Sequence, residues 1–329
     1  MRYAVWMVNT PGGPFQRIER ESKPLAGNEV LVRISASGVN PLDIKVRAAK
    51  SPHHRQPLPA VLGVDMAGTI VEVGPGVTAF RPGDEVYGMV GGVGGLQGTL
   101  AEFIAADADL LARKPKNLSP REAAALPVCI ITAWEGLVDR ANVRPRQKVL
   151  IHAGAGGVGH LAIQLARAFG AEVFATVSPE KKHVVESFGA SPIDYRSVSV
   201  SEYVTASTGG TGFDIVYDTI GGSTLDSSFE AVKIHTGHVV SCLGWGMHAL
   251  APLSFRGATY SGVFSLLPIF TGEGRAHQGE ILSKATELVE AGRLRPLLNE
   301  RMFSTREIAE AHEVVQAGSL GKVVISIQR

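Results

Sequence analysis

Cysteine is scarce in this sequence, which holds only Cys129 and Cys242 among its 329 residues. Two distant cysteines cannot build a disulfide framework, and they suit a protein of a reducing compartment. Neither sign of charge dominates, because 32 lysines and arginines face 31 aspartates and glutamates. Nucleic acids and membrane surfaces attract a basic excess, so we expect neither as a partner.

Long apolar runs are missing too, since no window approaches the roughly 20 apolar residues that cross a bilayer. The first residues, MRYAVWMVNTPGG, lack the apolar core of a signal peptide and are typical of a first strand. We therefore expect a cytoplasmic protein. Its length and its 45% hydrophobic content allow two domains with sizeable cores.

The apolar pattern divides the chain into three stretches. Up to about residue 120, β-branched runs broken by Gly and Pro predict an all-β module, whose Gly-rich segment 88–99 is either a flexible lid or a close backbone approach. A capping box at 119–122 then starts a helix that Pro127 should kink, and strands alternate with helices beyond it. We predict an α/β fold: a doubly wound parallel Rossmann sheet in 123–264, and a β-rich domain made of 1–122 and 265–329.

The segment HAGAGGVGHLAIQLARAFGAEV contains a glycine-rich turn, Gly154-x-Gly156-x-x-Gly159, with Gly157 and Val158 inside it. The turn follows the strand-like KVLIH and opens an amphipathic helix, and a second strand comes next. In that context the glycines let the backbone approach a pyrophosphate, and the helix N-terminus offers N–H groups and a favourable dipole. We predict dinucleotide binding, with a tight turn that has no ligand as the alternative.

The end of the second strand indicates which dinucleotide binds. An NAD site usually carries a carboxylate there for the ribose 2′-hydroxyl, but residues 176–179 read Thr-Val-Ser-Pro. Ser178, Lys182 and Tyr195 suit a 2′-phosphate instead, so we predict NADPH as the cofactor. The alternative is that Lys181 and Lys182 form an ordinary solvated helix face.

The segment GVNPLDIK places Asn40, Asp43 and Lys45 close together where an apolar strand ends. Asn and Pro favour turns, so a surface turn is one interpretation of the segment. A catalytic or ligand-binding loop is the other, and these residues alone do not decide between them.

The motifs together carry a family resemblance. NPLDIKVRAA, LPAVLGVDMAGTIVEVG, FRPGDEVYG and AGAGGVGHLAIQLARAFGAEV resemble the medium-chain dehydrogenase/reductase superfamily, over essentially the whole chain. They are most similar to its zinc-free quinone oxidoreductase branch, which includes zeta-crystallin, and to related enone reductases. The resemblance implies a GroES-like catalytic domain beside the Rossmann domain.

The resemblance also bears on zinc. Zinc-dependent relatives use a Cys where Asn40 stands, a His-Glu pair where Val64-Asp65 stands, and a second Cys near Val128, beside Cys129. A catalytic zinc needs about three nitrogen or sulfur ligands, so we expect no metal site. We expect the adjacent His53 and His54 to lie in an exposed loop.

Further site residues are implied by the resemblance alone. Asn40 should touch the cofactor or the substrate carbonyl, Lys45 should donate to the substrate oxygen, and Asp43 should orient Lys45 or cap the following helical turn. Trp245 departs from the Ser or Asn usual at its position. The other positions that match cofactor contacts of the branch are Thr132, Val158, Thr219, Leu243, Gly244, Val263, Phe264 and Lys322.

The sequence thus predicts an NADPH-dependent, zinc-free oxidoreductase. It would transfer hydride to a quinone or to the C=C bond of an α,β-unsaturated carbonyl, and the resemblance suggests a homodimer. Two alternatives stay open: a metal-free ketone or alcohol dehydrogenase, and an NADPH-binding sensor or structural protein with little turnover.

Overall fold

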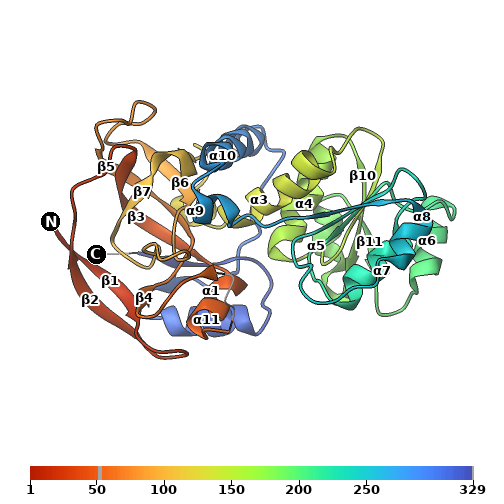
Figure 1. Ribbon diagram of the computed structural model, residues 1–329, viewed down its shortest axis with the longest axis horizontal. Coiled ribbons are helices and arrows are strands. Elements are labelled where there is room, and N and C mark those ends of the chain that lie inside the picture. Colours follow the sequence, from red (N-terminus) through yellow and green to blue (C-terminus); the bar gives the residue numbers. More distant parts are fainter. Residues whose placement is uncertain (51–53, 328–329) are drawn as a thin grey trace. The chain divides into compact units, whose positions relative to one another are not determined.

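The structure, a computed structural model, describes residues 1–50 and 54–327 (Figure 1). Two compact units are present: the first comprises Met1–Val128, Leu266–Gly292 and Pro296–Arg329, and the second comprises Cys129–Ser265 and Arg293–Arg295. The first division, at 128/129, lies six residues after the boundary expected at 122/123, and the second, at 265/266, lies one residue after the expected 264/265. Arg293–Arg295, expected in the first domain, belong to the second unit.

The first unit contains a seven-stranded sheet ordered β15-β16-β3-β5-β6-β8, with β7 also paired to β3, and a three-stranded sheet ordered β2-β1-β4. Helices α1 and α11 pack together, and α10 packs on β8 (Figure 1). The strands are β1 Arg2–Val8, β2 Phe15–Glu21, β3 Glu29–Val39, β4 Ala60–Val61, β5 Asp65–Val73, β6 Glu85–Met89, β7 Phe103–Asp107, β8 Leu111–Arg113, β15 Phe303–Ser304 and β16 Val323–Ser326. The helices are α1 Pro41–Arg47, η2 Ala108–Leu110, α2 Pro120–Ala123, α9 Leu267–Thr271, α10 Arg275–Glu290 and α11 Ile308–Gln316.

Strand β3 is the centre of the larger sheet. β5 pairs along one of its edges, while β7 and β16 pair with successive halves of the other edge. Val30, Val32 and Ile34 are buried, which the mostly apolar segment EVLVRISASGV predicts for a strand that contributes to the core. Gly38 has a packing role, because a Cβ there would lie 2.3 Å from the Ala124 carbonyl oxygen, just beyond α2.

The second unit is built on a six-stranded parallel sheet ordered β11-β10-β9-β12-β13-β14. Successive strands are added outward on one side of β9 and then, from β12 onward, on its other side. The switch point therefore lies between β9 and β12, and sheets of this kind bind ligands there, at the carboxyl ends of the strands. The strands are β9 Lys148–Ile151, β10 Glu172–Val177, β11 Ser191–Asp194, β12 Ile215–Asp218, β13 His238–Ser241 and β14 Thr259–Gly262. The helical elements are α3 Pro127–Trp134, which begins just before the division, the π-helix η3 Glu135–Arg140, α4 Gly157–Ala168, η4 Pro179–Lys181, α5 Lys182–Ser187, α6 Val200–Thr208, α7 Ser223–Ala231 and α8 Ala251–Arg256.

The core of the second unit is apolar and aromatic. Leu150, Val216 and Val239 from three neighbouring strands pack with Phe174 and Phe213, whose rings meet edge to face at 5.5 Å. The predicted parallel sheet covered by helices is confirmed.

The helix expected after residue 119 differs from the prediction. Its capping box is present, since the Ser119 N–H donates to the Glu122 carboxylate at 2.8 Å. However, α2 ends at Ala123 and a separate helix, α3, begins at Pro127. A proline inside a helix loses a hydrogen bond and clashes with the preceding turn, whereas at the first position it does neither. The expected kink is therefore a break between two helices.

The glycine-rich segment 88–99 is held by close backbone approaches. A Cβ at Gly91 would lie 1.9 Å from the Gln97 carbonyl oxygen, and one at Gly98 would lie 2.2 Å from that of Leu62. The Gln56 side chain also holds the segment, because its oxygen accepts a hydrogen bond from the Gly95 N–H at 2.8 Å. Of the two interpretations left open, the structure favours close approach over a flexible lid.

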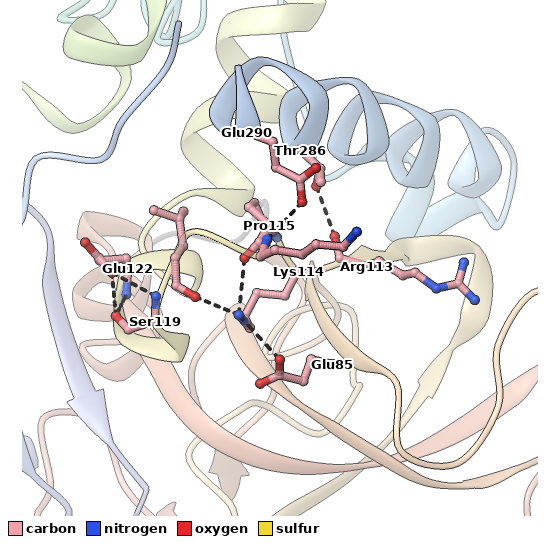
Figure 2. A network of polar contacts seen from close by, with 10 residues as sticks. Glu85, Arg113, Lys114, Pro115, Ser119, Glu122, Thr286 and Glu290 are labelled. Carbon is pink, nitrogen blue, oxygen red and sulfur yellow. Dashed lines mark hydrogen bonds and ion pairs between the residues drawn. The ribbon is translucent and has the colours of Figure 1, made fainter. Parts of the chain in front are cut away.

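A buried lysine organises the segment between β8 and α2, as Figure 2 shows. The Lys114 ammonium donates to the carbonyl oxygens of Leu118 at 2.6 Å and Pro115 at 3.2 Å. The Glu85 carboxylate lies 3.5 Å from the same ammonium. These contacts satisfy a charge that would otherwise be costly to bury.

Helix α10 ties down the same segment from the other side (Figure 2). The Thr286 hydroxyl donates to the Arg113 carbonyl oxygen at 3.0 Å, and the Glu290 carboxylate accepts from the Lys116 N–H at 2.9 Å. The strand end that leads to α2 is thereby fixed to α10 of its own unit.

Within the described ranges, the longest apolar helices fall short of what a membrane span requires.

Candidate active site

Three neighbouring strands of the first unit bring polar residues to one place. β16 pairs with β3 so that Val323 faces Val39, and β3 pairs with β5 so that Gly38 faces Asp65. Lys322 precedes β16, Asn40 follows β3, and Asp65 begins β5. Their side chains therefore meet at one end of the sheet, although they lie far apart in the sequence.

These three side chains form a buried network. The Asn40 side-chain oxygen accepts from the Lys322 ammonium, and its nitrogen donates to Asp65 Oδ2 at 2.9 Å. The Lys322 ammonium lies 3.7 Å from the same carboxylate. Asp65 Oδ1 accepts from the Val128 N–H at 2.9 Å, so the carboxylate also faces the first turn of α3.

Asp43 adds a second carboxyl group to the network. Its Oδ2 accepts from the backbone N–H of Asn40 at 2.8 Å, which fixes the start of α1. Asp43 and Asp65 are both fully buried, at 1% and 0% exposure, and among the described residues Lys322 is the cation that acts on both. Of the two roles expected for Asp43, the structure shows the helix cap.

Burial without a second cation shifts the proton affinity of these acids. Burial raises the pKa of Asp43 to about 7, and the nearby Asp65 carboxylate adds to the effect. Burial also raises the pKa of Asp65, while Lys322, Asn40 and the Val128 N–H act in the opposite direction. Because the donors gather around Asp65, we assign the negative charge to Asp65 and the proton to Asp43 below about pH 7.

This assignment predicts a pH-dependent stability. The Asp43 pKa is higher in the folded protein than its ordinary 3.8, so its contribution is complete below about pH 4 and is lost as the pH rises through about 7. Relative to Asp43→Asn, the parent should lose about 2–3 kcal/mol of unfolding free energy between pH 5 and pH 8. Urea unfolding of both proteins at each pH measures this difference, in which titrating groups that do not interact with Asp43 cancel. A difference that stays constant over this range would show that Asp43 ionises normally.

Lys45 lies apart from this network. It is exposed on α1, and its ammonium makes no hydrogen bond or ion pair with any described residue. It is therefore available to a ligand, while Asn40 and Asp43 are engaged within their own unit.

The glycine-rich turn of the second unit fits a dinucleotide. A Cβ at Gly159 would lie 2.1 Å from the Ala153 carbonyl oxygen, and one at Gly154 would lie 2.6 Å from the Ala175 Cβ. Glycine is thus required where α4 packs against β9 and β10. Helix α4 begins after Gly156 with no side-chain cap, and Gly157 and Val158 are not buried, which leaves its N-terminal N–H groups open to an anion.

Residues of the neighbouring strands hold this turn in place. Ala153 adopts a positive φ of 53°, which is uncommon for a residue with a side chain. The Thr176 hydroxyl oxygen accepts from the Ala153 N–H at 3.1 Å and lies 3.1 Å from His152 Nδ1. Burial lowers the pKa of His152 to about 4, so the imidazole is neutral and forms one hydrogen bond with the Thr176 hydroxyl through Nδ1. The turn is therefore formed before any ligand arrives.

The other predicted cofactor residues of the second unit lie at or near the carboxyl edge of its sheet. The Thr219 hydroxyl donates to the His152 carbonyl oxygen at 2.7 Å, at the switch point. The Thr132 hydroxyl donates to Ser265 at 3.2 Å, and the Phe264 ring meets Trp245 edge to face at 5.8 Å. The remaining members are Leu243 and Gly244, which follow β13, and Val263, which follows β14.

The predicted 2′-phosphate residues also gather at this edge. Ser178 follows β10 and is buried, Lys182 begins α5, and Tyr195 follows β11, which pairs with β10. Arg196 lies beside Tyr195, with its guanidinium carbon 5.7 Å from the ring centre. Two hydroxyl groups and two cations thus lie at the ends of neighbouring strands.

Groups of possible metal ligands are absent from the part of the chain that the structure describes. There, no three His, Cys, Asp or Glu side chains are grouped so that they could hold a metal ion. His54 is buried, contrary to the expected exposed position, while His53 lies outside the described residues. Val64 is also fully buried.

Comparison with known proteins places this geometry in a family. Two family models match: Alcohol dehydrogenase GroES-like domain over residues 26–116, and Zinc-binding dehydrogenase over residues 157–279. The 2-methylene-furan-3-one reductase of Solanum lycopersicum is 37% identical over 309 residues, which cover 91% of this chain and 71% of that protein. The chain belongs to the medium-chain dehydrogenase/reductase superfamily.

Other members of the superfamily show the same likeness. The chloroplastic NADPH-dependent alkenal/one oxidoreductase of Arabidopsis thaliana is 36% identical over 91% of this chain and 72% of its own length. An alcohol dehydrogenase superfamily protein from Novosphingobium aromaticivorans has a TM-score of 0.97 and 53% identity over 99% of this chain and 100% of that chain. The quinone oxidoreductase of Coxiella burnetii has a TM-score of 0.82 and 28% identity over 100% of both chains. By contrast, this chain spans 13% of the length of the spectinabilin polyketide synthase system protein NorB of Streptomyces orinoci, to which it is 36% identical.

Membership in the medium-chain dehydrogenase/reductase superfamily confirms the predicted family and the predicted pairing of a GroES-like domain with a Rossmann domain. The chain is an oxidoreductase of the kind that uses a nicotinamide coenzyme.

One member of the buried network had no predicted role. Asp65 stands beside Val64, where zinc-dependent relatives of the superfamily have their His-Glu pair, and its carboxylate links Asn40, Lys322 and α3. The available signal was a carboxylate at the very start of an apolar strand, LGVDMAGTI.

Proposed function

We propose that the protein is an NADPH-dependent, zinc-free reductase of quinones or of the C=C bond of α,β-unsaturated carbonyl compounds. The observation that carries the proposal is the state of Asn40, at the position where zinc-dependent relatives have a cysteine. Its amide binds Lys322 and Asp65, so the ligand position is occupied by an internal polar network. The enone, alkenal and quinone reductases among the relatives support the same reaction class.

The chemistry then follows from what the chain offers. Bound NADPH would supply a hydride. Without a metal Lewis acid, reduction is easiest where the negative charge develops on an oxygen that needs only hydrogen-bond donors, as in conjugate addition to an enone. The exposed Lys45 ammonium would donate to that oxygen, and solvent would protonate the α-carbon. Asn40, Asp43 and Lys322 would fix the start of α1 and hence the backbone that carries Lys45.

Metal independence has a direct test. We expect the purified protein to contain no stoichiometric zinc and to keep its NADPH oxidation with an enone in the presence of a chelator. Activity that is lost to the chelator and restored by added zinc would contradict the proposal.

We further propose NADPH as the preferred coenzyme. Ser178 follows β10, Lys182 begins α5 and Tyr195 follows β11, so these residues could bind the 2′-phosphate. Lys182→Ala should weaken NADPH binding roughly ten- to hundredfold and leave NADH binding nearly unchanged. Isothermal titration calorimetry with both coenzymes measures the two constants. Lys284→Ala, an exposed lysine on α10 in the first unit, is the matched control. Equal dissociation constants for NADPH and NADH in the parent would contradict the assignment.

We also propose a cytoplasmic homodimer. Along the described chain β14 pairs only with β13, so it forms an edge of the six-stranded sheet. The segment that precedes β14 in the chain carries exposed apolar side chains, including Met247 at 99% and Phe255 at 86% exposure. The chain has only two cysteines, Cys129 and Cys242, which suits a reducing location. Sedimentation velocity should give twice the chain mass, and a monomer at micromolar concentration would contradict the dimer.

A further inference from the structure

The predicted 2′-phosphate site contains an acidic residue that no earlier step uses. Glu180 lies in the short helix η4, two residues after Ser178, and its carboxylate is 3.5 Å from Arg196 Nη1. Residues 176–179 carry no acid, so the strand end is of the type that accepts a phosphate. Glu180, which follows that strand end, nevertheless places a negative charge beside it.

The surroundings of Glu180 are the groups that a phosphate would use. Its own backbone N–H, the Ser178 hydroxyl and then Arg196 and Lys181 hold the pKa of Glu180 below its usual value. Ser178 is buried, whereas Glu180 and Arg196 are about 58% and 57% exposed as side chains. An exposed pair of this kind is weak and can exchange partners readily.

The carboxylate can also serve a different coenzyme. In nicotinamide enzymes an Asp or Glu beyond the second strand accepts a hydrogen bond from the free ribose 2′-hydroxyl, whereas a cation binds the 2′-phosphate. In this chain a hydroxyl, a carboxylate and a guanidinium lie together at that strand end. The carboxylate suits NADH, and the guanidinium released from it suits NADPH.

We propose that Glu180 determines coenzyme specificity: it competes with the 2′-phosphate of NADPH for Arg196 and Ser178, and it accepts from the 2′-hydroxyl of NADH. This inference rests on the proposed use of NADPH. It adds that the preference for NADPH over NADH is small enough for NADH to serve as a second coenzyme.

The test is a set of dissociation constants for NADPH and NADH, measured by isothermal titration calorimetry at low ionic strength. Glu180→Gln should bind NADPH about three- to tenfold more tightly and NADH a few-fold more weakly. The gain for NADPH should shrink in high salt, because both charges are exposed. The control is Glu172→Gln at the opposite end of β10, which removes an exposed acid 3.9 Å from Lys148 and should change neither constant.

Making the same substitution in an Arg196→Gln variant tests whether Glu180 acts through Arg196. If Glu180 acts by occupying Arg196, the gain for NADPH should largely vanish when Glu180→Gln is made in Arg196→Gln. A gain that persists in full there, or an NADPH-to-NADH preference that Glu180→Gln leaves unchanged, overturns the inference. A parent that binds NADPH tightly while Glu180→Gln changes nothing leaves the proposed function intact, whereas a parent that binds neither coenzyme removes both.

Discussion

Replacing Lys45 by methionine should slow hydride transfer to an enone about 100- to 1,000-fold and leave NADPH affinity nearly unchanged. The expected size is the typical cost of removing one donor to a developing oxyanion. Methionine keeps most of the apolar stem, so little packing is lost at this exposed position. The effect should be smaller with a quinone, because a quinone spreads the developing charge over its ring.

Stopped-flow measurement of NADPH oxidation under single turnover isolates the hydride step from product release. Lys50→Met is the matched control, since Lys50 is an exposed lysine just beyond the same helix. If Lys45→Met transfers hydride to an enone as fast as the parent does, Lys45 is a surface lysine and GVNPLDIK is a turn.

Replacing Lys322 by methionine should lower the free energy of unfolding by about 3–5 kcal/mol. Removing one partner of a buried ion pair leaves the other charge without compensation, and Asp65 would then lose its only nearby cation in the network. The Asn40 side-chain oxygen would lose its donor as well. Urea unfolding followed by circular dichroism measures the loss, with Lys284→Met on α10 as the exposed control.

The double variant Lys322→Met/Asp65→Asn distinguishes an unpaired charge from a general packing defect. Because it removes both charges, it should be less destabilised than the sum of the two single variants. Additive losses, or a Lys322→Met protein within about 1 kcal/mol of the parent, would contradict the buried network as described.

Local patterns were sufficient for much of the fold. The turn Gly154-x-Gly156-x-x-Gly159 can be predicted from the sequence alone, because the strand, the helix and the required glycines are contiguous. The capping box at Ser119 is equally local. Pro127 interrupts the helical pattern as predicted, but it does so as the first residue of α3, because proline fits the first turn of a helix and not its interior.

The polar network could not be derived in the same way. Asn40, Asp65 and Lys322 meet only because β16, β3 and β5 are neighbours in the sheet, and that order depends on pairings between distant segments. The resemblance implies that Asn40 contacts the cofactor or the substrate carbonyl and that Lys322 lies near the cofactor, but it implies no link between them and gives Asp65 no role. The sequence pattern at 176–179 does not indicate Glu180, because its carboxylate, which lies beside Arg196, comes just after those residues.

The central claim is a metal-free hydride transfer to a conjugated carbon, and isotope transfer tests it most directly. NADPH carrying deuterium at C4 is mixed with an enone and the protein in the presence of a chelator, and the product is analysed by mass spectrometry and NMR. The account predicts a saturated ketone with deuterium on the β-carbon, formed at the rate of NADPH oxidation. An allylic alcohol with deuterium on the former carbonyl carbon, or no NADPH oxidation with any enone or quinone offered, would contradict it.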